Sequence, residues 1–205
     1  MKKFFLTQIL FGLSLLVMSG CSLQTILPPT SKYSLSADHD AKVISNSRFS
    51  DQVLRLGVTE SSGLLSGSNI YYSSENGKSY SYTKSRWNES VSKQLGSLLM
   101  RSITKTEIFK DVVPLRSLAK NDLILEMNIY DFSQVIHNDG STTLHLSLKL
   151  RVIEQYSRKI ISSKLFDMSE KEKEGNIEGA MKGYNTLVTR LLVETNSWLE
   201  ESCKQ

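Results

Sequence analysis

The chain has 205 residues, of which 40% are hydrophobic and 22% are charged. This is the composition of an ordinary globular domain, and it excludes a disordered or collagen-like chain. Lys and Arg number 25 against 21 Asp and Glu, a formal net charge of +4 spread along the sequence, so the charge does not indicate a nucleic-acid partner.

Residues 1–20 have the order of a secretory signal peptide. Lys2 and Lys3 precede an apolar run from Phe4 to Met18, and two small residues follow. The run is shorter than the roughly 20 residues of a membrane-spanning helix, and no comparable run occurs downstream. We therefore expect the mature protein not to span a membrane.

The sequence Val17-Met18-Ser19-Gly20-Cys21 resembles a bacterial lipobox, with Met18 where leucine is usual. We expect Cys21 to become the acylated first residue and its acyl chains, palmitate among them, to anchor the protein permanently, because two hydrophobic anchors already suffice. The alternative is a free thiol. An aspartate directly after the acylated cysteine resembles an inner-membrane retention signal. Ser22 occupies that position here, and the lack of the aspartate favours the periplasmic face of the outer membrane. Cys203 is expected to be an unpaired thiol at a frayed terminus.

Residues 21–52 are predicted to be the acylated cysteine and a flexible tether. They are rich in Ser and Thr and contain Pro28-Pro29, which favours extended, solvated chain. Tyr33-Ser34-Leu35 alternates and is a candidate edge strand. The periodicity changes near Val53, so we expect residues 53–205 to form a globular domain.

The first half of this domain shows a strand, a hairpin and a helix. Leu54, Leu56 and Val58 alternate with other residues, as in a half-buried strand. Residues 70–72 and 80–82 flank Asn76-Gly77, which predicts a β-hairpin with a type I′ turn. Its tyrosines either form a recognition surface or make ordinary cross-strand pairs. A helix is expected to begin at Asn88 as N-cap and to bury one face on a sheet.

The second half predicts antiparallel strands closed by a long helix. Residues 123–129 and 144–152 alternate on either side of a turn at 138–141, and a further strand is expected at about 159–166. The charge run 170–174 is interpreted as a solvated loop or helix start. Residues 177–199 follow helical periodicity for more than five turns, with a core-facing stripe. These elements predict a single α/β domain with a mixed β-sheet covered by amphipathic helices.

Catalytic and cofactor motifs are not found in the sequence. His39, His137 and His145 have no metal-ligand spacing, and the last two are interpreted as solvent-facing residues of one hairpin. Gly63-Leu64-Leu65-Ser66-Gly67 lacks the spacing of a serine-hydrolase elbow, and no phosphate-binding glycine loop occurs. We expect neither an enzyme nor a bound cofactor or metal.

The order of several features resembles the ABC-type transport auxiliary lipoprotein family, also called PqiC-like. These features are the lipobox, Tyr33 and Leu35 after the tether, Ile70-Tyr71-Tyr72, and Tyr82 followed by Arg86-Trp87 before an amphipathic helix. Ile108-Phe109 and Val112 follow. Asn88-Glu89-Ser90 stands where many relatives have a small residue and a proline.

The resemblance implies a three-layer α/β domain related to anticodon-binding-like folds. It also implies an outer-membrane lipoprotein that serves an ABC transporter whose substrate-binding subunit is a mammalian-cell-entry (MCE) protein. Such a system moves phospholipid or other hydrophobic molecules across the periplasm. The lipoprotein then docks the MCE subunit of the permease and ATPase complex, as a monomer or as a homo-oligomer.

Seven residues are candidates for contact with a partner or lipid. Leu64 and Leu65 lie in a Gly/Ser-rich loop with no obvious core to fill, although they fit equally well under the hairpin. Trp87 matches the family motif and also suits a buried helix entry. The full set of candidates is Leu64, Leu65, Ile70, Tyr72, Tyr82, Arg86 and Trp87.

Two other functions stay open from the sequence. The first is an outer-membrane assembly lipoprotein that partners a β-barrel, as in lipopolysaccharide export. The second is a cell-envelope hydrolase, which needs a cleft where a hydroxyl, a histidine and a carboxylate converge.

Overall fold

The computed structural model describes residues 29–37, 39–61 and 63–204 of the chain. The signal peptide and Cys21 lie outside these residues. The described elements, in chain order, are β1 (Ser31–Tyr33), β2 (Val53–Ser61), η1 (Gly63–Leu65), β3 (Asn69–Ser74), β4 (Ser79–Trp87), α2 (Val91–Thr104), β5 (Asp111–Val113), β6 (Leu123–Ile136), β7 (Thr142–Glu154), β8 (Ile160–Glu172) and α3 (Ile177–Lys204).

The strands form one mixed sheet around β6. Along one edge β6 pairs with β7, antiparallel over nearly its whole length, and β7 pairs in turn with β8. Along the other edge β6 pairs in parallel first with β2 and then with β3. The hairpin β3–β4 extends the sheet to β1, and β5 adds to the free edge of β2. A single α/β domain with a mixed sheet is therefore confirmed.

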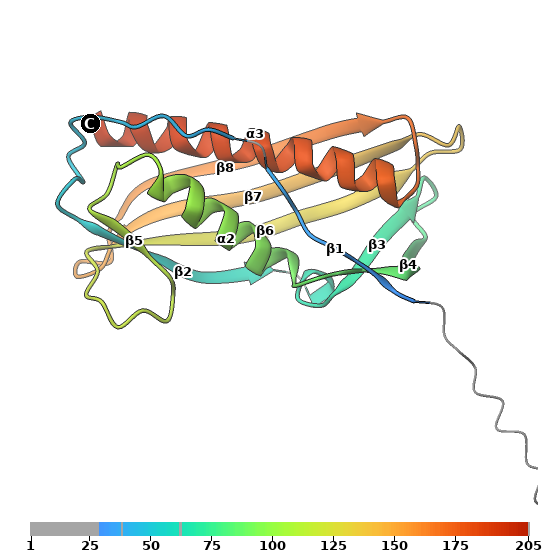
Figure 1. Cartoon of the computed structure of the whole chain (residues 1–205), viewed down its shortest axis with the longest axis horizontal. Helices are drawn as coiled ribbons and strands as arrows, with labels where there is room; N and C mark the ends of the chain where they lie inside the picture. Colours follow the sequence, from blue (N-terminus) through green and yellow to red (C-terminus); the bar gives the residue numbers. More distant parts are fainter. Residues whose placement is uncertain (1–28, 38, 62, 205) are drawn as a thin grey trace, which may run out of the picture.

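Both helices cover the same face of this sheet (Figure 1). Leu144, Leu146, Leu148, Leu150 and Val152 of β7 are fully buried on that face, as the period of two requires. The intervening residues of β7 are half-exposed on the opposite face. The described residues thus form two layers, and the third layer that the resemblance implies is not among them.

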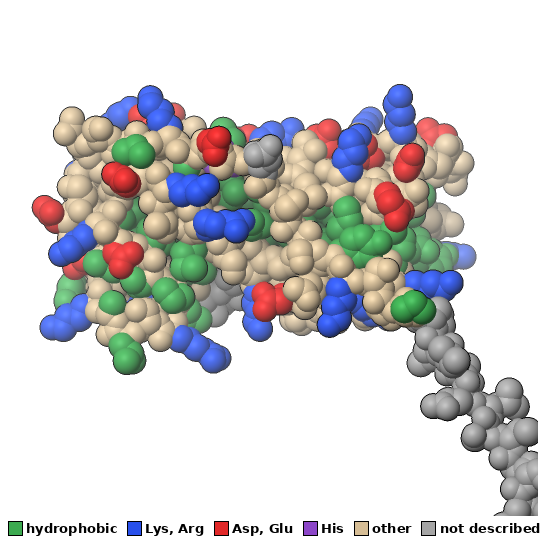
Figure 2. All heavy atoms as spheres, in the orientation of Figure 1, with side chains coloured by type: hydrophobic (Ala, Val, Ile, Leu, Met, Phe, Trp, Pro, Cys, Tyr) green, Lys and Arg blue, Asp and Glu red, His purple; other side chains and the backbone are tan. Residues whose placement is uncertain are grey.

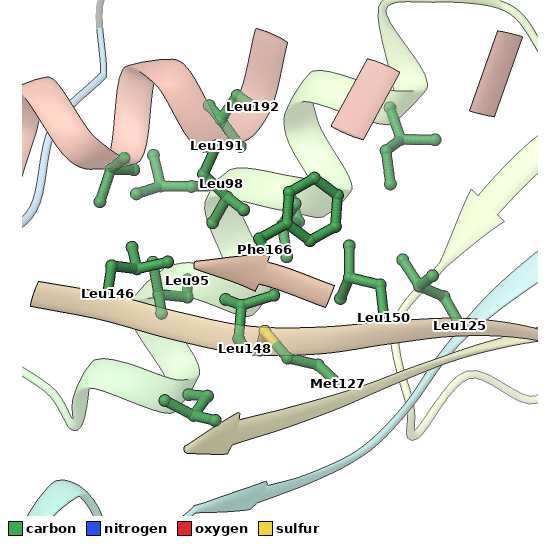
Figure 3. Close-up of a cluster of buried hydrophobic side chains, with 14 of the residues drawn as sticks. Leu95, Leu98, Leu125, Met127, Leu146, Leu148, Leu150, Phe166, Leu191 and Leu192 are labelled. Carbon is green, nitrogen blue, oxygen red and sulfur yellow. The ribbon is translucent and has the colours of Figure 1, made fainter. Parts of the chain in front are cut away.

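The core lies between the sheet and the helix stripes. Leu191 and Leu192 of α3 point toward Phe166 and the leucines of β7, while Leu95 and Leu98 approach from α2 (Figure 3). Each leucine buried in this way contributes about 1.5–3 kcal/mol relative to an exposed one. At Gly183 an added Cβ would lie 2.5 Å from Leu144 Cδ2, so glycine lets α3 approach β7 closely.

The predicted start of the packed domain at Val53 is too late. Leu35 and Phe49 belong to the buried core, and β1 pairs in parallel with β4. The backbone N–H of Leu35 donates to Gln94 Oε1 at 2.7 Å, and that of Ile44 donates to the Thr106 carbonyl at 2.8 Å. Residues 31–52 therefore contribute a strand and core side chains, because isolated apolar residues in a polar stretch find places against the helices.

The hairpin of β3 and β4 is confirmed, but its turn is not type I′. Gly77 has a φ of 79°, whereas Asn76 is not among the residues with positive φ. The Gly77 N–H donates to the Ser74 carbonyl at 2.8 Å, and the Ser74 N–H donates to the Lys78 carbonyl at 3.0 Å. This is the type I turn with a glycine bulge, in which only one residue needs the left-handed conformation.

Two predicted boundaries also move. Helix α2 begins at Val91 with Ser90 as N-cap. Asn88 instead extends the pairing of β4 with β1, since its N–H donates to the Tyr33 carbonyl at 2.8 Å. Strand β8 continues through Glu172, so most of the charge run is strand and not loop. Its carboxylates face basic residues of α3, with Glu172 at 2.8 Å from Lys182.

Cys203 is not frayed. It is free and buried in the last turn of α3, with 5% of its surface exposed. Burial raises the pKa of its thiol. Cys203 is therefore a small core residue and not a reactive terminus.

Candidate functional site

A cavity of about 140 Å³ lies where the second edge of β6 is interrupted. The β2 ladder on that edge ends at Ile129, and the β3 ladder begins at Val135. Between them the chain leaves the sheet through η1 and residues 66–68 before it returns as β3. The cavity fills this interval, with residues 130–134 of β6 on one side and β3 on the other.

Three aromatic residues from three elements form the inner wall of the cavity. The rings of Phe132 and Tyr184 are stacked with centroids 4.2 Å apart, and the Trp87 ring lies 5.9 Å from that of Tyr184 and 6.2 Å from that of Phe132. All three side chains are buried and also belong to the core. The wall is therefore rigid, because any shift of a ring would disturb the packing of α3 on the sheet.

Gln134 supplies the buried polar group of the site. It is fully buried, and its Oε1 accepts a hydrogen bond from the Tyr82 hydroxyl at 3.0 Å. Its backbone carbonyl accepts one from Ser73 Oγ at 3.3 Å. Its Nε2 has no hydrogen-bond partner among the described residues. Burying an amide group without a hydrogen-bond partner costs free energy, so the unpaired Nε2 of Gln134 is an unusual feature of this site.

Two phenol groups near the cavity stay protonated at neutral pH. Burial raises the pKa of Tyr82 to about 12. Burial and then the nearby charge of Asp131 raise the pKa of Tyr184. Both groups therefore act as neutral hydroxyls, and the wall of the cavity carries no phenolate charge.

The structure brings four of the seven candidate residues to the cavity. Leu65, Ile70, Tyr72 and Trp87 line it. Tyr82 lies beside them through its bond to Gln134 and its tilted contact with Tyr72, with centroids 4.8 Å apart.

The remaining candidates do not line the cavity or are not described. Arg86 turns back to its own strand and donates to the carbonyls of Tyr82 and Ser85, so it supports the backbone of β4. Leu64 lies in η1, and its side chain is outside the described structure, as is Cys21.

Sequence reasoning missed Phe132, Gln134 and Tyr184. Tyr184 occupies an inward position of α3, where an aromatic ring is typical of ordinary core. Phe132 and Gln134 carried no usable signal, because Leu123 to Ile129 set the inward positions at odd numbers. The register shift after Ile129 moves the inward positions to Phe132 and Gln134, and alternation alone does not reveal it.

A second polar cluster joins the β3–β4 turn to the β6–β7 hairpin. His137 Nδ1 lies 2.8 Å from Glu75 Oε1, and His137 Nε2 lies 2.8 Å from Thr143 Oγ1. His137 is thus not simply a solvent-facing hairpin residue. The order of hydroxyl, imidazole and carboxylate matches that of a hydrolase triad.

The position of Thr143 favours a structural role for this cluster. Thr143 lies in the middle strand of three and pairs with Val135 on one side and Lys171 on the other. A nucleophile on a regular ladder lacks the exposed turn that presents a catalytic hydroxyl and leaves adjacent N–H groups free for an oxyanion. We interpret the cluster as a clasp that holds the two hairpins together.

No helix within residues 29–37, 39–61 and 63–204 is long and apolar enough to cross a bilayer. The same residues contain no group of three or more His, Cys, Asp or Glu side chains placed to hold a metal ion.

A family model described as "ABC-type transport auxiliary lipoprotein component" matches residues 33–195. The chain belongs to this family. This auxiliary lipoprotein is thus a component associated with ABC-type transport. The resemblance found in the sequence is confirmed, and the match includes the hairpin, the residues that line the cavity and α3 as far as residue 195.

Solved structures share its fold at low sequence identity. A crystal structure of a protein from Xanthomonas campestris has a TM-score of 0.72 and 11% sequence identity. The alignment covers 85% of this chain and 98% of the Xanthomonas campestris chain. A crystal structure of an uncharacterized protein has a TM-score of 0.60 and 14% identity, covering 83% and 98% of the two chains. No curated protein sequence matches the auxiliary lipoprotein.

Proposed function

We propose that the auxiliary lipoprotein is a non-catalytic docking component of an MCE-type ABC transport system that moves phospholipid or other hydrophobic molecules across the periplasm. Acylated Cys21 holds it on the periplasmic face of the outer membrane. The cavity between β3 and β6 receives an apolar side chain of the MCE subunit. The observation that carries this proposal is a rigid aromatic cavity within a family of transport auxiliary components.

The dimensions and walls of the cavity suit a protein side chain. Its volume of about 140 Å³ is below the roughly 300–1,000 Å³ of pockets for drug-sized ligands. Aromatic pockets of side-chain size are typical hot spots of protein interfaces, because a large apolar group is fully desolvated there. Tyr130, which is 56% exposed, and the half-buried Tyr72 stand at its rim.

The position of β1 supports the same assignment. Strand β1, the first described element after the predicted lipidation site, pairs with β4, and β4 pairs with β3 at the cavity. Strand β1 and the hairpin strands β3 and β4 beside the cavity therefore lie at the same end of the molecule (Figure 1). A partner that delivers lipid to the membrane would meet the cavity close to the bilayer.

Site-specific photo-crosslinking in native membranes tests the proposal. We expect a photoreactive phenylalanine analogue at Tyr130, beside the cavity, to cross-link to an MCE subunit. The matched control is the same analogue at Tyr156, which is 82% exposed in the β7–β8 turn, and we expect no such product there.

The identity of the product separates the alternatives. A β-barrel cross-linked at Tyr130 would replace the transport proposal with the assembly function. The same MCE product from Tyr130 and Tyr156 would contradict the assignment of the cavity as the contact.

The hydrolase alternative has its own test. Thr143→Val removes the hydroxyl next to His137 while keeping a β-branched strand residue. We expect no change in hydrolysis of ester or glycan probes by purified membranes, and an activity lost in this variant alone would restore the enzymatic hypothesis.

A further inference from the structure

Two neighbouring loops place exposed apolar side chains at the end of the molecule opposite to β1. They are residues 114–122, between β5 and β6, and residues 155–159, between β7 and β8 (Figure 1). The Gln155 N–H donates to the Asp122 carbonyl at 2.8 Å, which joins the loops. Leu118 has a relative exposure of 102%, Tyr156 of 82% and Leu115 of 45%.

The exposure of Leu118 is built into its loop. The Arg55 guanidinium donates to the carbonyl of Ser117 at 3.3 Å and to that of Ala119. These two carbonyls flank Leu118, so the guanidinium holds the loop from the protein side while the leucine points outward. The Ser117 N–H closes the preceding turn on the Pro114 carbonyl at 3.0 Å. Leu118 therefore gains no hydrophobic stabilisation from folding and stays available for contact with another surface.

Cationic side chains surround these apolar groups. Arg116 and Lys120 are exposed in the first loop, and Arg158 and Lys159 are exposed at the second. The two carboxylates within the loops or beside them already have partners: Asp122 Oδ2 accepts from the Val53 N–H at 2.9 Å, and Glu154 accepts from Ser157 Oγ. Figure 2 shows hydrophobic and basic side chains close together at the lower left of the view, where these loops lie.

We propose that this loop surface, formed by residues 114–122 and 155–159, docks onto the phospholipid headgroup region of the membrane that carries the acyl anchor. Leu115 and Leu118 enter the interface, Tyr156 lies at headgroup level, and the four cations meet lipid phosphates. Apolar tips with an amphipathic tyrosine and flanking Lys and Arg are the combination that favours a membrane interface. A protein hot spot, by contrast, is usually a pocket or a buried anchor.

The length of the tether favours the same occupant. Cys21 and Pro29, the first described residue, are eight positions apart, which spans at most about 27 Å when fully extended. An anchored domain therefore stays near the bilayer. Strand β1 and the loop of residues 114–122 both lie along the lower edge of the view in Figure 1, so one membrane plane can meet both.

Fluorescence depth measurements on the full-length acylated protein test this docking. Leu118→Cys and, as a control, Val193→Cys on the exposed side of α3 are each labelled with an environment-sensitive fluorophore in a Cys203→Ala background. Val193 is 43% exposed and lies outside the loop surface. The proteins are reconstituted in vesicles of phosphatidylethanolamine and phosphatidylglycerol.

We expect the probe at position 118 to shift to the blue and to be quenched several-fold more strongly by spin-labelled lipid than the probe at 193. Arg116→Glu with Lys120→Glu should reduce this quenching several-fold. A probe at 118 that iodide quenches as strongly as at 193 would overturn the proposal. So would a blue shift that appears only when an MCE protein is added, because the surface would then be a protein interface. This result is independent of the cross-link at Tyr130.

Discussion

The two ends of the auxiliary lipoprotein differ in how they place their aromatic and apolar side chains. At the cavity, Trp87, Phe132 and Tyr184 are buried and the opening reaches inward to the core. At the loop surface, Leu118 and Tyr156 project outward and touch little. The side chains of the cavity wall therefore contribute to the stability of the fold, whereas those of the loop surface contribute little. Substitutions in the cavity wall should therefore lower the free energy of unfolding, and substitutions in the loop surface should leave it nearly unchanged.

The largest effect is expected from Trp87→Ala. It removes a ring that is 4% exposed and contacts both Phe132 and Tyr184, so it leaves a void in the core as well as in the cavity wall. We expect the free energy of unfolding to fall by about 3–5 kcal/mol in denaturant titrations. A loss below that of an exposed substitution would show that the cavity wall is not part of the core.

A smaller loss is expected from Tyr82→Phe. This change deletes the hydroxyl that donates to Gln134 Oε1 and leaves a fully buried amide with neither polar atom paired. The expected destabilisation is about 1–3 kcal/mol. Adding Gln134→Leu removes the stranded amide and should recover most of it in a double-mutant cycle. An additive double mutant would contradict the pairing.

Alkaline pH should weaken the fold through the same tyrosine. The pKa of Tyr82 is raised from 10.0 to about 12 in the folded protein, so the folded state favours the neutral phenol. Its contribution is complete below pH 10 and is lost as the pH rises toward about 12. Stability curves of the wild type should fall more steeply over this range than those of Tyr82→Phe. Parallel curves would show that Tyr82 is not involved.

The regular half of the fold was predictable from sequence because its residues obey one period each. The leucines of β7 recur at every second residue, and the apolar stripe of α3 follows helical spacing. The structure places both sets against the core, as expected. The charge run at the end of β8 was misread, since charges usually indicate solvent. Here Glu170 and Glu172 face Arg190 and Lys182 of α3, a tertiary partnership that no local pattern reveals.

Less of the candidate site was predictable. Ile70, Tyr72 and Trp87 were found from the hairpin and the family motif, yet the cavity depends on where β2 leaves β6 and where β3 returns. That register is set by η1 and the loop after it, which carry no periodicity. Gln134 comes from a strand more than fifty residues away from the hairpin, so only the folded sheet brings it to Tyr82.

At the opposite end, Arg55→Met tests how the exposed loop is held. The change removes the guanidinium that donates to the carbonyls of Ser117 and Ala119 but keeps an unbranched side chain. We expect a loss of about 1 kcal/mol, since these carbonyls can recover bonds with water. Hydrogen exchange at residues 116–121 should become faster while exchange in β7 is unchanged. Uniform acceleration of both would mean that Arg55 supports the whole sheet.

The smallest effect on stability is expected from Leu118→Asp. A side chain with a relative exposure of 102% has no contacts to lose, so the free energy of unfolding should change by no more than about 0.5 kcal/mol. The same variant should nevertheless weaken membrane contact of the loop surface, because a carboxylate replaces an apolar group among cations that meet lipid phosphates. At the loop surface, membrane contact is thus lost without a loss of stability. At Trp87, by contrast, any loss of binding accompanies a loss of stability. A clear destabilisation by Leu118→Asp in denaturant titrations would show that the leucine is packed in solution, and the contrast between the two ends would then fail.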